Sequence, residues 1–311
     1  MKAVFLDANT LGDDVDLASI EQVAGALVKH EKTSPDEVLN RIRGFDTVLV
    51  NKVVLKREHF EACPELKTIA VVATGLNNID QEAARQHGIR VMNVMNYGRS
   101  TVAQHTMALM LALATRLIDY DRDVRAGRWG KSDMFCLMDH PILELEGRTL
   151  GVVGYGDLGQ GVVERARAFG MNILLGARPG QEAGEVDGYA RIPLDELLPK
   201  VDVLSVHCLL TDDTRNLIGA RELKMMKREA LLINTSRGGL VEEQALADAL
   251  RAGEIGGAGF DVLTEEPPRN GNPLLADDIP NLIITPHSAW ASREARQRIV
   301  EITARNLSSV A

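Results

Sequence analysis

Short apolar runs and longer stretches with helical spacing alternate along the whole of this sequence. The first apolar run, Ala3 to Leu6, is followed by others at Thr47 to Val50, Thr68 to Val72 and Val91 to Val94. Between them lie stretches with helical spacing, such as Gln81 to His87, after which a glycine is suited to cap the helix. The alternation contains no internal repeat or low-complexity tract, and it is typical of an α/β fold with mostly parallel sheets.

One helix start is marked by its local chemistry. Ser34 and Glu37 have the spacing of a capping box, with Pro35 at the position of the first helical residue, so we expect a helix that runs from there toward Ile42. Together with the four apolar runs, this predicts one small α/β unit over residues 1 to about 98.

A second set of strands begins near residue 150. The expected strands are Leu150 to Val153, Ile173 to Leu175, Val203 to Val206, Leu231 to Asn234, Gly257 to Val262 and Leu282 to Ile284. Helical stretches such as Glu242 to Ala252 separate them, and six strands suffice for a doubly wound sheet. A helix from Thr101 to Arg116 precedes this set, and a last helix from Arg293 to Leu307 follows it.

The order of these elements predicts the domain organisation. We expect two Rossmann-like, doubly wound parallel-sheet domains, with a dinucleotide-binding domain over residues 99–287 inserted into a smaller, discontinuous substrate domain. The smaller domain would contain residues 1–98 and a returning C-terminal helix in residues 288–311. The cleft between two such domains is the default position for a small-molecule site.

The charge, the apolar segments and the cysteines of the sequence limit the kinds of partner and cellular location that we expect. The formal net charge of −9 argues against nucleic acid or an anionic membrane as the main partner. We expect no membrane-spanning segment and no secretory signal, which favours the cytoplasm. The three cysteines, Cys63, Cys136 and Cys208, have neither disulfide-framework nor zinc spacing, so we expect reduced thiols and no metal site.

The most informative motif follows the strand that starts the second set. It reads Gly154-Tyr-Gly-Asp-Leu-Gly159 and leads into a helical stretch, so it contains Gly154, Gly156, Asp157, Leu158 and Gly159 between strand and helix. The first glycine allows a tight turn, the second allows the backbone to approach a pyrophosphate, and the third allows helix and strand to pack closely. Taken alone the motif could be an ordinary glycine-rich turn. Its position between a strand and a helix favours a dinucleotide site.

Polar residues follow the carboxyl ends of three strands in the second set, at the edge of the sheet where ligands bind in open parallel sheets. Arg237 follows one strand and precedes two glycines, Asp261 ends the next with Glu266 five residues on, and His287 follows the last. Each has a simpler interpretation: a surface cation, a turn or loop acid, and a capping or core histidine. Their shared position at neighbouring strand ends favours one functional site.

The motifs that carry these residues resemble the D-isomer-specific 2-hydroxyacid dehydrogenase family. The resemblance rests on Gly154–Gly159 and on three later segments: Asn234-Thr-Ser-Arg-Gly-Gly-Leu-Val241, Asp261-Val-Leu-Thr-Glu-Glu-Pro-Pro268 and Thr285-Pro-His-Ser-Ala-Trp-Ala-Ser292. It extends into the first third of the chain through Ala73-Thr-Gly-Leu-Asn-Asn-Ile-Asp80 and Ser100-Thr-Val-Ala-Gln-His105. It implies a homodimer held by the helix and arm around residues 101–147.

The resemblance also assigns roles that the chemistry of the residues supports. His287 would donate the proton to the developing alkoxide, Glu266 would hold a ring nitrogen of His287, and Arg237 would bind the substrate carboxylate and carbonyl oxygen. The backbone around Thr74, Gly75 and Leu76 would bind the other end of the carboxylate.

Three further residues are assigned to the cofactor by the resemblance. Asp261 would accept a hydrogen bond from the nicotinamide carboxamide, and Thr235 and His207 would line the nicotinamide and ribose. The choice of cofactor depends on the second strand, which ends in Gly176-Ala-Arg178, where an acid would bind a ribose 2′-hydroxyl. Because that acid is missing and Arg178 can pair with a 2′-phosphate, we favour NADP over NAD. The alternative is that Arg178 stacks on adenine or faces solvent.

Within the family, Asn51-Lys-Val-Val, Gly127-Arg-Trp, Phe135-Cys136 and His287-Ser-Ala-Trp290 most resemble the glycerate dehydrogenase, or hydroxypyruvate and glyoxylate reductase, branch. This implies reduction of a small 2-oxo acid, glyoxylate or hydroxypyruvate, for which the end of the second strand favours NADPH as the hydride donor. One alternative is an NAD-linked dehydrogenase of another 2-hydroxy acid. The other is a dinucleotide-sensing corepressor, which the intact set of proposed catalytic residues disfavours.

Overall fold

The computed structural model describes residues 1–310 and divides them into two compact units. Unit 1 contains residues 1–98 and the chain from Ala291 onward, and unit 2 contains Arg99–Trp290. The second boundary falls three residues later than the sequence predicts. Ser288 and Ala289 belong with unit 2 because their N–H groups donate to the Asp261 carboxylate in that unit.

Unit 1 is built on a parallel five-stranded sheet in the order β2-β1-β3-β4-β5. Its strands are β1 (Lys2–Phe5), β2 (Ala26–Lys29), β3 (Thr47–Val50), β4 (Thr68–Val71) and β5 (Arg90–Met92). The residues of β3 and β4 are buried throughout, as expected for parallel strands covered on both faces. Strand β2 is not predicted from the sequence, because it is a largely exposed strand at the sheet edge with only three apolar residues to mark it.

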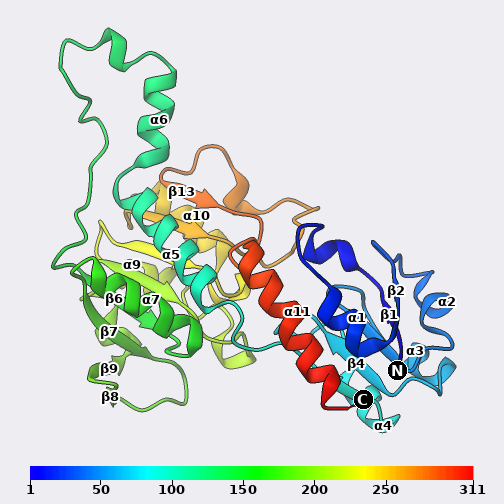
Figure 1. The fold of residues 1–311 in the computed structure, drawn as a ribbon. Helices are drawn as coiled ribbons and strands as arrows, with labels where there is room; N and C mark the ends of the chain where they lie inside the picture. Colours follow the sequence, from blue (N-terminus) through cyan, green and yellow to red (C-terminus); the bar gives the residue numbers. More distant parts are fainter. Residues whose placement is uncertain (311) are drawn as a thin grey trace. The chain divides into compact units, whose positions relative to one another are not determined.

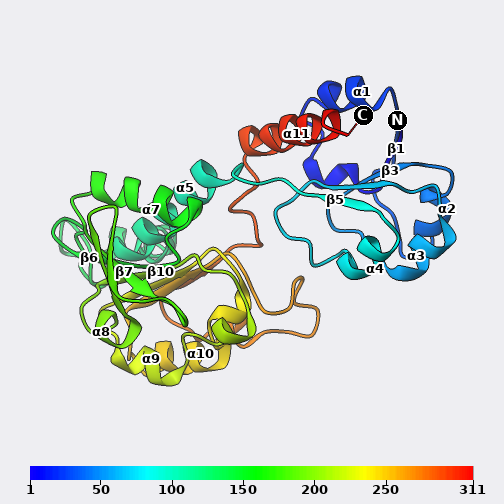
Figure 2. The same ribbon diagram turned by 90° about the horizontal axis from the view of Figure 1, so that it is seen from below.

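Helices cover the sheet of unit 1. They are α1 (Ala18–Ala24), α2 (Val38–Ile42), α3 (Arg57–Ala62), α4 (Gln81–Gln86) and α11 (Arg293–Ser308). The last helix, α11, lies beside α1 (Figures 1 and 2), and a side-chain ion pair joins Arg296 to Asp14 nearby. The predicted capping box is displaced. Glu37 accepts from Ser34 as expected, but these residues form a turn and α2 starts only at Val38.

Unit 2 is built on an eight-stranded sheet in the order β13-β12-β11-β10-β6-β7-β9-β8. Its strands are β6 (Thr149–Val153), β7 (Asn172–Ala177), β8 (Gly184–Val186), β9 (Tyr189–Pro193), β10 (Val203–Val206), β11 (Leu231–Asn234), β12 (Gly257–Phe260) and β13 (Leu282–Ile284). All pairings are parallel except that of β8 with β9. The six predicted strands are present, and the hairpin of β8 and β9 adds to them. Chain order reverses between β6 and β10, which is the switch point where ligands of such sheets bind.

Side chains from alternate positions of the central strands fill the two faces of this sheet. Leu231 and Ile233 of β11 join the apolar cluster on one face, whereas Leu232 between them joins the cluster on the other. Both clusters are closed by helices. These are α5 (Arg99–Ala114), α7 (Asp157–Ala168), α8 (Leu194–Leu197), α9 (Ala220–Met225) and α10 (Glu243–Arg251). The remaining α-helix of unit 2, α6 (Leu117–Arg125), contributes no residue to either cluster. Short 3-10 helices lie at Ala8–Leu11, Trp129–Lys131, Asp212–Thr214, Gly238–Leu240 and Pro273–Leu275.

The helix predicted from Thr101 to Arg116 is broken near its end. Helix α5 stops at Ala114, and Arg116 adopts a left-handed conformation with φ of 54° before α6 begins. In residues 1–310, no single helix is long and apolar enough to cross a membrane. By length and composition alone, α5 and α6 meet that test only as a pair bent by 58°.

Candidate active site

The three motif glycines of unit 2 lie in three different settings. A side chain at Gly154, where φ is 100°, would collide with the backbone of His207 and Cys208 after β10. A side chain at Gly159 would collide with the Gly154 carbonyl oxygen, so this glycine allows α7 to pack against β6. Gly156 has open space around it, with no atom within 4 Å of the position that a methyl group would occupy. The turn thus combines two close backbone contacts with one open position, which fits the cradle that a pyrophosphate requires.

Asp157 and Leu158 form the first turn of α7, directly after this open position. Leu158 is half-buried, and the Asp157 carboxylate lies 3.4 Å from the guanidinium of Arg99 at the start of α5. The first turn of α7 follows the open position at Gly156 directly, and the helix dipole favours an anion there.

The end of β10 supplies a buried imidazole with an unused nitrogen. His207 contacts the hydroxyl of Ser205 through Nε2 at 2.8 Å, while Nδ1 is buried and has no partner within residues 1–310. Burial lowers the pKa of His207 to about 4, so this ring is neutral at pH 7. An unsatisfied buried nitrogen beside the glycine turn fits a residue that faces a bound cofactor.

Arg178 lies immediately after β7 and is half-buried. Burial raises the pKa of the neighbouring strand-end thiol, Cys208, and the positive charge of Arg178 acts in the opposite direction. The guanidinium therefore lies near the carboxyl end of β10 and on the same edge of the sheet as the glycine turn.

Arg237 follows β11, and a single side chain fixes its backbone. The amide of Asn234 donates to the Arg237 carbonyl at 2.8 Å and accepts from the Ser236 N–H at 3.0 Å. Arg237 itself is exposed, and its guanidinium donates to the Ser236 carbonyl at 2.7 Å. Next to it, Gly238 leaves room for the backbone that follows β12, where any side chain would collide with Leu263.

Glu266 and His287 meet in a direct hydrogen bond. Glu266 Oε2 lies 2.6 Å from His287 Nδ1, and Glu266 Oε1 accepts from the Leu263 N–H at 2.8 Å. Burial raises the pKa of Glu266, but the hydrogen bonds from His287 and Leu263, with the nearby charge of Arg237, outweigh it. The net pKa lies below the ordinary value. Glu266 is therefore ionised at neutral pH and fixes the orientation of the imidazole.

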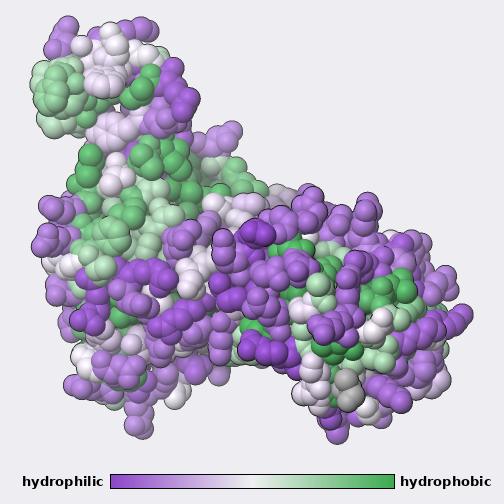
Figure 3. Space-filling model, in the orientation of Figure 1, coloured by the Kyte–Doolittle hydropathy of each residue, from purple (hydrophilic) through white to green (hydrophobic). Residues whose placement is uncertain are grey.

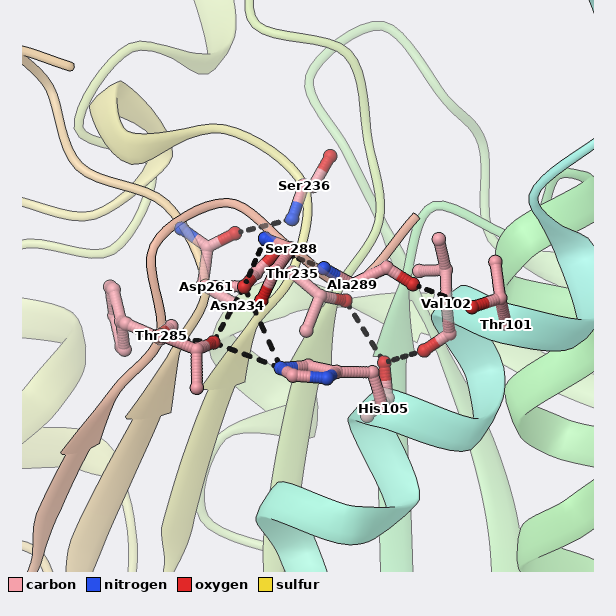
Figure 4. A network of polar contacts seen from close by, with 12 residues as sticks. Thr101, Val102, His105, Asn234, Thr235, Ser236, Asp261, Thr285, Ser288 and Ala289 are labelled. Atoms are coloured by element: carbon pink, nitrogen blue, oxygen red, sulfur yellow. Dashed lines mark hydrogen bonds and ion pairs between the residues drawn. The ribbon is translucent and has the colours of Figure 1, made fainter. Parts of the chain in front are cut away.

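Asp261 is surrounded by protein donors. It is 1% exposed, and its carboxylate accepts from the Thr285 hydroxyl and from the N–H groups of Ser288 and Ala289 (Figure 4). A carboxylate has about four acceptor positions, so one is left for another donor. The other predicted cofactor residue in this part of the site, Thr235, is also buried, and its hydroxyl lies 2.9 Å from that of Thr106.

The predicted substrate-binding residues of unit 1 follow β4. Thr74 is fixed by its own hydroxyl, which donates to the Val94 carbonyl at 2.8 Å. Within residues 1–310, the N–H groups of Thr74, Gly75 and Leu76 donate to no backbone carbonyl. They are available to an anion at the carboxyl edge of this sheet.

The structure adds three polar residues that the sequence analysis does not single out: Asn234, Thr285 and His105. Asn234 and Thr285 occupy strand ends inside recognisable motifs, so their positions gave a signal. His105 lies in the middle of an apolar helix, where spacing predicts only packing. Within residues 1–310, no group of three or more His, Cys, Asp or Glu side chains is arranged to hold a metal ion.

A glycine turn at the switch point of a parallel sheet, with an arginine and a carboxylate–imidazole pair at nearby strand ends, defines a dinucleotide-dependent oxidoreductase. The chain belongs to the D-isomer specific 2-hydroxyacid dehydrogenase family, because residues 107–289 match the family's NAD binding domain. It is an enzyme of this class, as the sequence predicts.

Individual relatives agree with this assignment. The chain is 44% identical over 301 residues to the glycerate dehydrogenase of Methylorubrum extorquens, covering 96% of this chain and 93% of that protein. It is 37% identical over 311 residues to the hydroxypyruvate reductase of Blautia hydrogenotrophica, with coverage of 99% and 96%. The solved structure of the acyclic imino acid reductase Bsp5, in complex with NADPH and D-Arg, has a TM-score of 0.86 at 28% identity, with coverage of 100% and 97%. The predicted family and its glycerate dehydrogenase and hydroxypyruvate reductase branch are confirmed.

Proposed function

We propose that this enzyme reduces a small 2-oxo acid, glyoxylate or hydroxypyruvate, to the D-2-hydroxy acid by hydride transfer from NADPH. The observation that carries the proposal is the 2.6 Å contact of Glu266 with His287 at a strand end near Arg237. The names of the glycerate dehydrogenase and hydroxypyruvate reductase relatives support the choice of substrate.

The residues divide the work of reduction among them. When bound, the nicotinamide supplies the hydride. Because Glu266 occupies Nδ1 of His287, the proton for the developing alkoxide leaves from Nε2. Arg237 presents a planar fork of donors to the substrate carboxylate and carbonyl oxygen. We assign the N–H groups of Thr74, Gly75 and Leu76 to the substrate carboxylate, and Asp261 and Thr235 to the nicotinamide.

The preference for NADPH rests on the end of β7. The acid that would accept from a ribose 2′-hydroxyl is replaced by Ala177, and the cation of Arg178 follows it. Gly176 cannot carry that acid in its place, because a side chain there would collide with Val153 and Leu197. The NADPH complex of the Bsp5 relative is consistent with this choice.

The cofactor proposal predicts a measurable ratio. A charge-assisted hydrogen bond contributes about 1.5 to 3 kcal/mol, and about 1.4 kcal/mol is tenfold, so kcat/KM with NADPH should exceed that with NADH by roughly tenfold or more. The assay is oxidation of each cofactor with glyoxylate, hydroxypyruvate and larger 2-oxo acids. Ala177→Asp combined with Arg178→Ala should reverse the order, because the new carboxylate repels a phosphate and accepts from a free hydroxyl.

A matched variant separates a local effect from loss of charge. Arg228→Ala removes an exposed cation elsewhere in unit 2, whose guanidinium donates to the Gly253 carbonyl, and should leave the cofactor ratio unchanged. Equal use of NADH and NADPH by the wild type would refute the NADPH preference. Activity with NADH alone on a larger 2-hydroxy acid would favour the NAD-linked alternative.

We also propose that the enzyme is a homodimer formed through residues 117–142, here called the arm. The arm contains α6 and the loop after it, which extends from the rest of unit 2 (Figure 1), and apolar side chains gather on it (Figure 3). The large apolar side chains exposed along it are Leu117, Ile118, Val124, Trp129, Met134, Phe135, Met138 and Ile142. So much exposed apolar surface on an ordered segment is typical of an interface.

The arm is held in shape by its own polar contacts. The Asp123 carboxylate lies 2.8 Å from His140 Nε2 and 2.7 Å from the Arg128 guanidinium, and the Tyr120 hydroxyl donates to the His140 carbonyl. The hydrogen bonds from Arg128 and His140 hold the pKa of Asp123 below its usual range. A pre-ordered arm lowers the entropy cost of binding a second copy.

A further inference from the structure

His105 belongs to a chain of hydrogen bonds that ends at the backbone beside His287. The ring Nε2 of His105, on α5, lies 2.9 Å from the Thr285 hydroxyl oxygen, which in turn lies 2.5 Å from Asp261 Oδ1 (Figure 4). The His105 side chain is 23% exposed and that of Asp261 1%. None of the roles proposed above uses His105 or Thr285.

The direction of these hydrogen bonds follows from the groups involved. The Thr285 hydroxyl donates its single proton to Asp261 Oδ1, which also accepts from the Ser288 N–H. The Thr285 oxygen must then accept from its other neighbour, the His105 ring. His105 therefore carries a proton on Nε2, and the chain runs from His105 through Thr285 to Asp261.

Asp261, at the end of this series of hydrogen bonds, fixes a backbone conformation of His287 that is otherwise unfavourable. His287 adopts a left-handed conformation with φ of 53°, which non-glycine residues rarely occupy. Its N–H donates to the Asp261 carbonyl at 2.8 Å, and the next two N–H groups, of Ser288 and Ala289, donate to the Asp261 carboxylate at 2.9 and 2.8 Å. Asp261 is thus the main support of the conformation that directs the His287 ring.

A second contact from the same helix reinforces this support. Thr101 lies one turn before His105 on α5, and its hydroxyl donates to the Ala289 carbonyl at 3.0 Å (Figure 4). One face of α5 therefore binds the segment on both sides of His287, through Thr285 and through Ala289.

We propose that His105 is a positioning residue for His287: its Nε2–H, acting through Thr285, fixes the Asp261 carboxylate that holds the His287 backbone. The inference rests on the proposed function in so far as His287 is the proton donor. Without the donor from His105, the Thr285 hydroxyl is free to rotate, Asp261 loses its fixed orientation, and the left-handed backbone relaxes.

The kinetic test compares two substitutions at this residue. His105→Leu removes the donor. For the 2-oxo acid that the wild type reduces best, kcat should then fall about tenfold, which is the typical effect of losing one hydrogen bond. The Kd for NADPH, measured by fluorescence, should change less than kcat. His105→Gln places an amide donor near the former Nε2 and should recover most of the activity. A substitution that acts only through helix packing would show no such rescue.

A control variant and a measurement without substrate complete the test. Thr115→Val removes a hydroxyl that bonds to Leu111 near the end of the same helix, away from the network, and should leave kcat unchanged. In the protein without cofactor, nitrogen-15 NMR of the histidine rings should show His105 protonated at Nε2. The amide hydrogens of Ser288 and Ala289 should exchange faster in His105→Leu than in the wild type or His105→Gln.

The outcomes are separable. An unprotonated Nε2 on His105, or unchanged amide exchange and unchanged kcat in a folded His105→Leu, would overturn the inference while leaving the proposed function intact. A wild type that reduces no 2-oxo acid would overturn the proposed function, and the NMR and exchange measurements would still decide whether His105 supports the His287 backbone.

Discussion

The position of Arg237 is fixed by its neighbours and not by its own side chain. The guanidinium donates to the carbonyl of Ser236, whereas two hydrogen bonds of Asn234 fix the backbone around it. An exposed cation held in this way adds little to stability and is available to an anion.

Arg237→Ala should therefore leave the melting temperature close to that of the wild type and remove most of the activity. Loss of a donor to the reacting oxygen costs roughly 3 kcal/mol, or about a hundredfold in kcat. The kcat of Arg237→Lys should lie between those of Arg237→Ala and the wild type, since lysine keeps the charge and loses the planar fork. Steady-state kinetics with the best 2-oxo acid measure the effect, and a wild-type rate in Arg237→Ala would exclude Arg237 from the site.

Glu266→Gln should change the pH dependence of reduction more than its maximum. The pKa of Glu266 lies below its ordinary value, so in the wild type the side chain is ionised across the neutral range and its negative charge lies against the imidazole of His287. The amide keeps a hydrogen bond and loses the charge. The decline of the reduction rate with rising pH should then occur at lower pH in the variant, as a kcat/KM profile will show.

The same pKa shift has a consequence for stability. A carboxylate with a lowered folded-state pKa stabilises the protein above its unfolded-state pKa, and the contribution is lost as the pH falls through the folded-state pKa. Acid should therefore destabilise the wild type more than Glu266→Gln, which has no group to protonate there. Identical pH profiles of both activity and unfolding would contradict the Glu266–His287 pair.

At the scale of elements, the junction of β6 and α7 allows a matched comparison of two glycines. Gly156→Ala should fold with near wild-type stability, because its φ of −92° suits any residue and nothing lies within 4 Å of the added methyl group. Its Kd for NADPH should nevertheless rise, since the methyl group enters the space for the pyrophosphate. Gly159→Ala should lower the melting temperature instead, because the methyl group would force α7 away from the Gly154 carbonyl.

Calorimetry together with cofactor titration distinguishes the two variants. A destabilised Gly156→Ala with normal cofactor affinity would contradict the assignment of this turn to the pyrophosphate.

The sequence predicted the buried strands well and missed the exposed strands β2, β8 and β9, for a physical reason. Strands such as β11 are buried on both faces, so they are unbroken apolar runs bounded by polar residues, and those polar residues include Arg237. The hairpin of β8 and β9 is largely exposed at the edge of the sheet, and its residues carry no such pattern.

The same reasoning explains what was found and missed in the candidate site. Glu266 and His287 follow the ends of apolar strands, so the sequence points to them. The left-handed backbone of His287 and the hydrogen bond of His105 to Thr285 depend on elements far apart in the chain, and no local pattern reports them.

The arm is the surface through which we expect two copies of the protein to form a dimer. Phe135 and Met138 are 87% and 79% exposed, and we expect them to become buried against a second copy. Phe135→Ser combined with Met138→Ser should shift the mass in light scattering from two chains to one at micromolar concentration, since loss of a central apolar anchor typically costs about 2 kcal/mol or more. Val28→Ser, which removes an exposed apolar side chain on β2, should leave the mass unchanged. A wild type that is already monomeric would refute the dimer.

The pairing of α1 with α11 in unit 1 has a consequence for the order in which the chain can fold. A ribosome releases residues 1–98 first, but the helix that packs beside α1 begins only at Arg293, after all of unit 2. Nascent unit 1 must therefore wait with the α1 surface uncovered, whereas unit 2 is continuous and can fold as soon as it emerges. During synthesis, the inserted unit is expected to reach its native state before the unit that contains the N-terminus.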